Sequence, residues 1–157
     1  MKKVLIFGGI IVAIFVAIGV LTSMQNSEKV SEDNPYKKDS LHPETVSQLD
    51  DPNYQNVILP EDLDSALENG DDVTVYFYSP LCQFCKQATP ILMPVADSLG
   101  VEVQQYNLEE FKQGFGDYGI ESTPTLVQFK NGKEVARIVG AQSAVEYENF
   151  LNTNSVE

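Results

Sequence analysis

Hydrophobic and polar positions divide the chain into three parts. Residues 4–21 form an uninterrupted apolar run, residues 24–51 are polar without apolar periodicity, and the rest alternates between strand-like and helix-like patterns. At ~1.5 Å per residue, the apolar run would form a helix of about 27 Å, close to the hydrocarbon thickness of a bilayer. The pattern therefore predicts a membrane anchor at 1–23, a flexible polar stalk at 24–51 and a folded domain at 52–157.

The flanks of the apolar run set its expected orientation. Lys2 and Lys3 precede it, and basic residues hold their end of a membrane helix in the cytoplasm. A cleaved signal peptide is the alternative, but its apolar segment is usually shorter and ends at a small-x-small site that is absent here. Both interpretations export the domain. The long run favours a single-pass protein of the cell membrane, with a cytoplasmic N-terminus and an extracytoplasmic domain.

Within the folded part, the pattern predicts the order β-α-β-α-β-α-β-β-α. Strands are expected within 56–60, 72–79, 101–108 and, as a hairpin, 123–140, and helices within 61–70, 83–100, 109–119 and 143–151. Asn131-Gly132 is a strong hairpin signal, and Ser143 with Glu146 forms a capping box. The order predicts an α/β fold with a central mixed sheet and helices on both faces.

Apolar spacing also predicts which side chains of the helices face the core. These are Leu63, Ala66, Leu67, Ile91, Leu92, Val95, Leu99, Val145, Phe150 and Leu151.

Charge excludes one class of partner. The chain has 23 acidic and 10 basic residues, which gives a formal net charge of -13. Nucleic acids and anionic membrane surfaces attract Lys and Arg and repel such a surface. We therefore expect no nucleic-acid partner.

The only two cysteines in the sequence, Cys82 and Cys85, lie where a predicted buried strand meets a predicted helix. The first N–H groups of a helix lack partners within it and carry partial positive charge. A thiolate at Cys82 is therefore favoured, which lowers its pKa and makes it the attacking sulfur. Cys85, one turn later and expected to be more buried, is placed to resolve a mixed disulfide.

Two other roles for the pair fit less well. A structural zinc site needs about four Cys or His ligands, and the sequence adds only His42, in the polar stalk. A structural disulfide that closes so short a loop removes little entropy from the unfolded chain. A zinc site shared by two chains and a disulfide kept without activity stay open as alternatives. We expect no metal and no cofactor.

Three stretches, in the same order, resemble the thioredoxin family. They are CQFCK followed by Pro90, IESTPTLVQFKNGKEV, and VGAQSAVEYENFL, and the resemblance covers about residues 54–152. It implies a thioredoxin-like three-layer fold and thiol–disulfide exchange. It also implies a cis-proline at Pro124, placed with Thr123 against the cysteines, where the Thr123 backbone receives an extended substrate segment.

Within that family, the chain resembles the membrane-anchored extracytoplasmic thioredoxin-like proteins of Gram-positive bacteria, including the bacteriocin-transport accessory type. The stretch between Cys85 and Thr123 leaves room for one strand and one short helix, as in the smallest members. Gln83 and Phe84 lie between the cysteines, and we expect both to contact the substrate.

The resemblance has four departures. Leu81 stands where thioredoxins usually have Trp, and Gln83-Phe84 replaces Gly-Pro. Tyr76 falls at the position of a buried Asp, and Gln105 at that of a nearby Lys, which together move protons to and from the second cysteine. These losses put fast reduction in question, while thiol exchange itself stays possible.

The sequence therefore predicts an extracytoplasmic thiol–disulfide oxidoreductase that exchanges disulfides with exported proteins through Cys82 and Cys85. Its expected partners are the thiols and disulfides of those proteins and a membrane redox protein, and the chain is expected to be a monomer. The alternative is a non-catalytic, membrane-tethered docking module for a secreted peptide or a transporter. Whether the protein oxidises, reduces or isomerises is left open.

Overall fold

The computed structural model describes residues 2–30 and 33–156, which fall into two units, Met1–Val46 and Ser47–Glu157. The first unit holds α1 (Lys2–Lys29) and α2 (Pro43–Val46). Among the residues described in full, no helix is both long enough and apolar enough to cross a membrane.

The predicted stalk, 24–51, contains local structure. Its first residues continue α1, and its later part forms turns and the short α2. Asn34 donates a side-chain hydrogen bond of 2.8 Å to the carbonyl of Lys38, and the Glu44 N–H donates to Nδ1 of His42 at 3.2 Å. Residues 31 and 32 lie outside the described part, so the flexibility of this segment stays a prediction.

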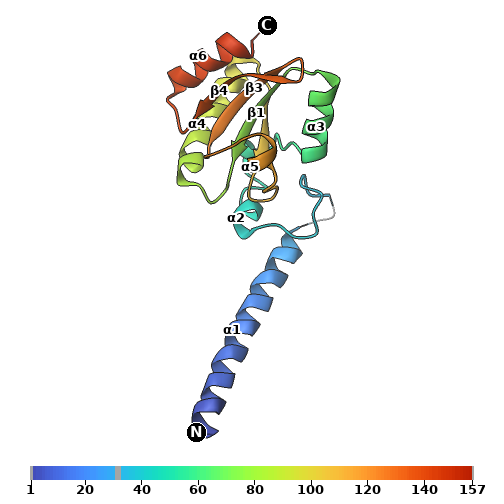
Figure 1. Ribbon diagram of the computed structural model, residues 1–157. Coiled ribbons are helices and arrows are strands. Elements are labelled where there is room, and N and C mark those ends of the chain that lie inside the picture. The colour runs from blue at the N-terminus through green and yellow to red at the C-terminus, as the bar shows by residue number, and fades with distance from the viewer. Residues whose placement is uncertain (1, 31–32, 157) are drawn as a thin grey trace. The chain divides into compact units, whose positions relative to one another are not determined.

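The second unit is built on a four-stranded mixed sheet with the order β2-β1-β3-β4 (Figure 1). Its elements are η1 (Pro52–Tyr54), α3 (Pro60–Asn69), β1 (Val73–Tyr78), α4 (Gln83–Leu99), β2 (Val103–Asn107), α5 (Gly114–Asp117), β3 (Thr125–Lys130), β4 (Lys133–Val139) and α6 (Ala144–Asn154). Strand β1 pairs parallel with β2 and antiparallel with β3, and β3 pairs antiparallel with β4.

Strand β1 lies at the centre of the core because both of its faces are covered. Val75 and Phe77 enter a cluster with Leu63 of α3, whereas Tyr76 and Tyr78 enter a second cluster on the other face, with residues of α4 and α6. Alternating side chains of a strand point to opposite faces, so helices on both sides explain the run of buried residues. The predicted mixed sheet with helices on both faces is confirmed.

Local signals for helix ends and turns are also confirmed. Gly70 and Gly100 end α3 and α4 in the left-handed conformation, with φ of 80° and 67°. Asn131 and Gly132 have φ of 51° and 70°, as the tight turn between β3 and β4 requires. Ser143 and the Glu146 three residues later form the capping box of α6.

Two predicted elements are shorter than expected. The strand predicted within 56–60 is a single bridge between Val57 and Gln105. Pro60 begins α3 immediately afterwards, so too few residues remain for a ladder. The helix predicted within 109–119 is reduced to α5, because a glycine-rich stretch has little helix propensity.

Two predicted core positions are wrong. Val145 is 63% exposed, and Tyr147 fills that side of α6 instead. Ile91 is 37% exposed, whereas its neighbour Leu92 is fully buried. The other core positions predicted in these helices include Leu92 and Leu151, which are fully buried, so the error concerns only the edge of each buried stripe.

Candidate functional site

Both cysteines lie at the end of β1 where the chain turns into α4. The Cys82 N–H donates to the carbonyl of Ser79 at 3.1 Å, which closes the turn, and Cys82 is the N-cap of α4. Its Sγ accepts the backbone N–H of Cys85 at 3.2 Å, as an N-cap oxygen does in other helices. The predicted location of Cys82 at the helix start is confirmed.

The two thiols have opposite environments. Cys82 is partly exposed and Cys85 is 1% exposed. Burial, the largest effect, raises the pKa of Cys82, but hydrogen bonds, led by that from the Cys85 side chain, outweigh it and bring the pKa below its ordinary value. Burial first, and then the hydrogen bond with Cys82, raise the pKa of Cys85 to about 12. The geometry therefore favours ionisation of the accessible Cys82 thiol and disfavours that of the buried Cys85 thiol.

Thr123 and Pro124 lie beside this pair, although 41 residues separate Thr123 from Cys82 in sequence. The Thr123–Pro124 peptide bond is cis. The Cys82 thiol donates to the carbonyl of Thr123 at 3.3 Å. Thus the structure brings together Cys82, Cys85 and the Thr123–Pro124 pair.

The residues around Cys82 form an apolar, exposed surface. Phe84 is 64% exposed and Leu81 48% exposed, and Gln83 is also exposed. Large apolar side chains left in solvent beside a reactive sulfur are available for contact with a partner.

Sequence reasoning placed Tyr76 near the thiols but missed Thr89 and the other tyrosines of the shell around Cys85. Tyr76 is fully buried, and its hydroxyl lies 3.1 Å from Oγ1 of Thr89. Thr89 in turn donates to the carbonyl of Cys85 at 2.9 Å. The i, i+4 spacing of Cys85 and Thr89 was the available signal, because a helical threonine can bond the carbonyl one turn back. The tyrosines Tyr54, Tyr78 and Tyr147 complete this cluster.

Gln105, at the position of the expected lysine, is buried and serves the fold. Its Nε2 donates to the carbonyl of Asn53 at 2.6 Å, and its Oε1 accepts the Asn56 N–H at 3.3 Å. These bonds hold the segment before α3 against the edge strand β2. Gln105 therefore offers no proton to the thiols.

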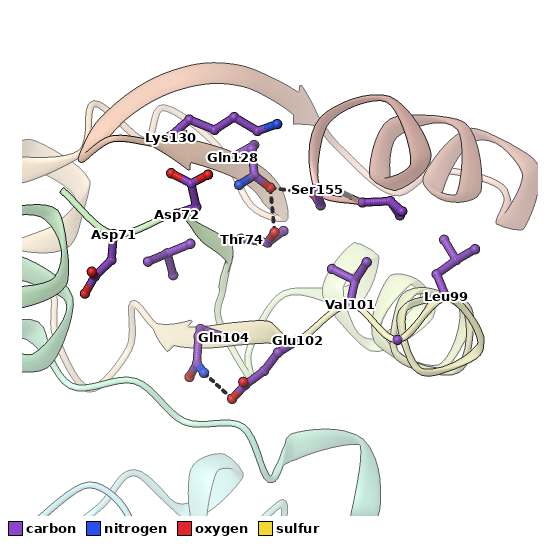
Figure 2. Close-up of a pocket in the computed structure, with 13 residues that line it drawn as sticks. Asp71, Asp72, Thr74, Leu99, Val101, Glu102, Gln104, Gln128, Lys130 and Ser155 are labelled. Carbon is purple, nitrogen blue, oxygen red and sulfur yellow. Dashed lines mark hydrogen bonds between the residues drawn. The ribbon is translucent and has the colours of Figure 1, made fainter.

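A hollow of about 760 Å³ lies at the other end of β1, where Val73 and Thr74 line it. Figure 2 shows Gln128 beside Thr74 and Ser155, and its side chain accepts hydrogen bonds from both hydroxyls. Neither cysteine lines this hollow, so it is separate from the thiol site. Within the described part of the chain, no group of three or more His, Cys, Asp or Glu side chains is placed to hold a metal ion.

Comparison with known proteins agrees with this fold. A thioredoxin family model matches residues 54–153, more than half of the chain, and the chain belongs to the thioredoxin family. The thioredoxin of Chlamydia pneumoniae is 35% identical over 100 residues, which cover 63% of this chain and 97% of that protein. The thioredoxin of Haemophilus influenzae is 28% identical over 109 residues, covering 68% of this chain and 94% of that protein.

A solved structure shows the same likeness. Thioredoxin Mala s 13 of Malassezia sympodialis superimposes with a TM-score of 0.56 at 25% identity, covering 64% of this chain and 90% of that one. Membership of the family supports a thiol–disulfide redox role in general.

Proposed function

We propose that the chain is an oxidoreductase that exchanges disulfides with exported proteins through Cys82 and Cys85. One observation carries the proposal: the partly exposed Sγ of Cys82 accepts the Cys85 N–H at the start of α4. A sulfur held there is stabilised as the thiolate, which is the form that attacks a disulfide.

The exchange proceeds in two steps. The Cys82 thiolate attacks one sulfur of a substrate disulfide, so that a mixed disulfide forms and a substrate thiolate leaves. Cys85 then attacks Sγ of Cys82, the second substrate thiolate leaves, and the protein holds the disulfide. The reverse sequence oxidises a dithiol. The exposed surface of Leu81, Gln83 and Phe84 contacts the substrate. Thr123 and Pro124, beside Cys82, contact it as well.

Trapping tests this assignment. A Cys85→Ser variant of the full chain should accumulate mixed disulfides with exported proteins, because the step that releases them is lost. They would be seen as reductant-sensitive bands on a non-reducing gel. The control is Cys82→Ser/Cys85→Ser, which should trap nothing.

The cellular phenotype of a Cys82→Ser variant distinguishes a catalytic role from a docking role. If the chain were only a membrane-tethered docking module, Cys82→Ser would leave its cellular role intact. A folded Cys82→Ser protein that fully replaces the wild type would therefore overturn the proposal.

We also propose that the N-terminal segment anchors the chain in the cell membrane and leaves the thioredoxin-family domain outside. The support is the apolar run at 4–21 with Lys2 and Lys3 before it. Carbonate extraction should leave the protein in the membrane pellet, and protease added to intact protoplasts should remove the domain. Release into the soluble fraction would count against the anchor, and protection from protease against the orientation.

A further inference from the structure

The side chains that enclose Cys85 are neutral. Four tyrosines share its buried cluster: Tyr54 from η1, Tyr76 and Tyr78 from β1, and Tyr147 from α6. In the part of the chain that the structure describes, the other buried polar side chains are amides and hydroxyls, with no carboxylate, lysine, arginine or histidine among them. The cluster therefore lacks a charged group that could accept a proton.

The phenol of Tyr76 does not replace such a group. Thr89 uses its single hydroxyl proton in the bond to the Cys85 carbonyl, so Tyr76 is the donor in its bond to Thr89. Burial, followed by the charge of Cys85, raises the pKa of Tyr76 far above its ordinary value. The phenol therefore stays protonated and holds Thr89 and α4 in place.

The remaining groups that act on the Cys85 thiol are Cys82, the Thr123 side chain and the Ser79 backbone. Charges on Asp51 and Lys86 reach Tyr54 but are not among the effects on Cys85. Among the groups that act on the Cys85 thiol, Cys82 is thus the one whose thiolate can accept the Cys85 proton. That acceptor is lost when Cys82 enters a mixed disulfide, because its sulfur is then neutral.

Attack by Cys85 on the mixed disulfide must then wait for a base from outside the cluster, from solvent or the departing substrate thiolate, to reach Cys85, which is 1% exposed. A thiolate of the substrate can also attack the mixed disulfide and release Cys82, and this reaction needs no base inside the cluster. The Cys82 sulfur is partly exposed. Because the Cys82 pKa is lowered by the hydrogen bonds at the helix start, it is also a good leaving group.

We propose that, on a substrate with a free thiol beside its disulfide, the protein rearranges disulfides instead of reducing them. The reason is that the neutral shell around Cys85 slows its attack, so the substrate's own thiolate releases Cys82 first. This activity rests on the proposed function, and it assigns Tyr76 to the neutral shell that leaves the second cysteine without a base.

The reaction balances without an added oxidant or reductant. The Cys82 thiolate attacks a sulfur of the substrate disulfide, and the other sulfur leaves as a thiolate. A third substrate thiolate then attacks the substrate sulfur of the mixed disulfide. A new substrate disulfide forms, Cys82 leaves as the thiolate, and no net electrons move.

A three-cysteine peptide tests the proposal. The peptide carries one disulfide and one free thiol, and a matched peptide has serine in place of the free cysteine. Reduced full-length protein in detergent is mixed with each at pH 7, quenched with acid and analysed by mass spectrometry. The three-cysteine peptide should yield re-paired disulfide over fully reduced peptide by at least about tenfold. The serine peptide should be recovered mainly as its original disulfide, because the thiolate that leaves in the first step can only attack back and release Cys82.

The outcomes separate the two proposals. Reduced peptide together with a Cys82–Cys85 disulfide as the main products would overturn the rearrangement and leave the proposed function standing. Re-pairing of the three-cysteine peptide no faster than without the protein, with neither peptide reduced nor linked to Cys82, would overturn both.

Position 76 offers a matched pair of variants. Tyr76→Asp supplies a carboxylate near Cys85 and should shorten the lifetime of a mixed disulfide formed beforehand between Cys82 and a peptide with a single cysteine by at least about tenfold. Tyr76→Phe, which keeps the ring and adds no base, should change that lifetime less than about twofold. If the mixed disulfide has the same lifetime in folded Tyr76→Asp and folded Tyr76→Phe, the lack of a base around Cys85 does not slow its attack, and the proposal is overturned.

The wild-type protein supplies a test that does not depend on a folded variant. If solvent base limits attack by Cys85, the lifetime of the mixed disulfide should fall about tenfold per pH unit between pH 7 and 9. A lifetime independent of pH over that range would overturn the proposal.

Discussion

The hydroxyl groups of Tyr76 and Thr89 lie 3.1 Å apart in the interior and join the central strand to the helix that carries both cysteines. The Thr89 hydroxyl in turn donates a hydrogen bond of 2.9 Å to the carbonyl of Cys85. Tyr76, which the resemblance to the family aligned with a buried acid, acts here through a neutral hydrogen bond. It fixes the place of α4 without supplying charge to the thiols.

A double-mutant cycle measures that link. Tyr76→Phe removes one hydrogen bond and should lower the free energy of unfolding by about 1 kcal/mol. Thr89→Val keeps the side-chain shape but leaves the buried phenol without its acceptor, which should cost about 1–3 kcal/mol. Urea unfolding of the reduced proteins should show a coupling of about 1 kcal/mol. If the two losses of unfolding free energy simply add in the double variant, the hydrogen bond between Tyr76 and Thr89 is not present.

The reactivity of Cys82 should depend on its neighbour. Its pKa is lowered partly by the Cys85 side chain, so Cys85→Ala should raise that pKa and reduce the thiolate fraction at pH 7. The rate of alkylation by iodoacetamide, measured against pH, reports the change. In the wild type, the midpoint should lie below the ordinary value of 9.0, and in the variant it should move upward. An unchanged midpoint would show that the Cys85 thiol does not stabilise the Cys82 thiolate.

Much of this site could be predicted from the sequence because its signals are local. The cysteine pair, its position at a strand–helix junction and the capping of α6 each depend on a few neighbouring residues. Contacts across the fold could not be predicted in that way. The pairing of Tyr76 with Thr89 depends on how β1 docks on α4, and Gln105 is held by residues of the segment before α3.

The errors have the same origin. Val145 and Tyr147 both fit an apolar helix stripe, and only packing against the sheet decides that Tyr147 is buried and Val145 exposed. Spacing along one helix does not fix its rotation about its axis to within a residue. Tertiary packing supplies that information.

The reduced protein should lose stability at alkaline pH through Cys85. Its pKa is raised in the fold from 9.0 to about 12, so the folded state prefers the neutral thiol. The stability that this preference contributes is fully present below pH 9 and is lost as the pH rises from 9 to 12. The loss amounts to roughly 4 kcal/mol at most.

Cys85→Ala isolates this effect from the buried tyrosines, whose ionisation acts in the same direction. The difference in unfolding free energy between wild type and variant should shrink as the pH rises from 8 to 11. A constant difference would contradict the burial of the Cys85 thiol as the cause.

The hairpin turn gives a prediction about the fold alone. Gly132 has φ of 70°, and a Cβ there would lie 2.0 Å from the carbonyl oxygen of Leu67, which is backbone and cannot move aside cheaply. Gly132→Ala should therefore cost roughly 3 kcal/mol or more of unfolding free energy, from the strained conformation and the clash together.

Gly116→Ala is the matched control, because nothing lies within 4 Å of its added Cβ. It should be neutral or stabilising by up to about 1 kcal/mol. Since the turn lies at the opposite end of β3 from Pro124, alkylation of Cys82 in the folded protein should be the same in both variants. A Gly132→Ala protein as stable as Gly116→Ala would show that the turn can shift away from Leu67.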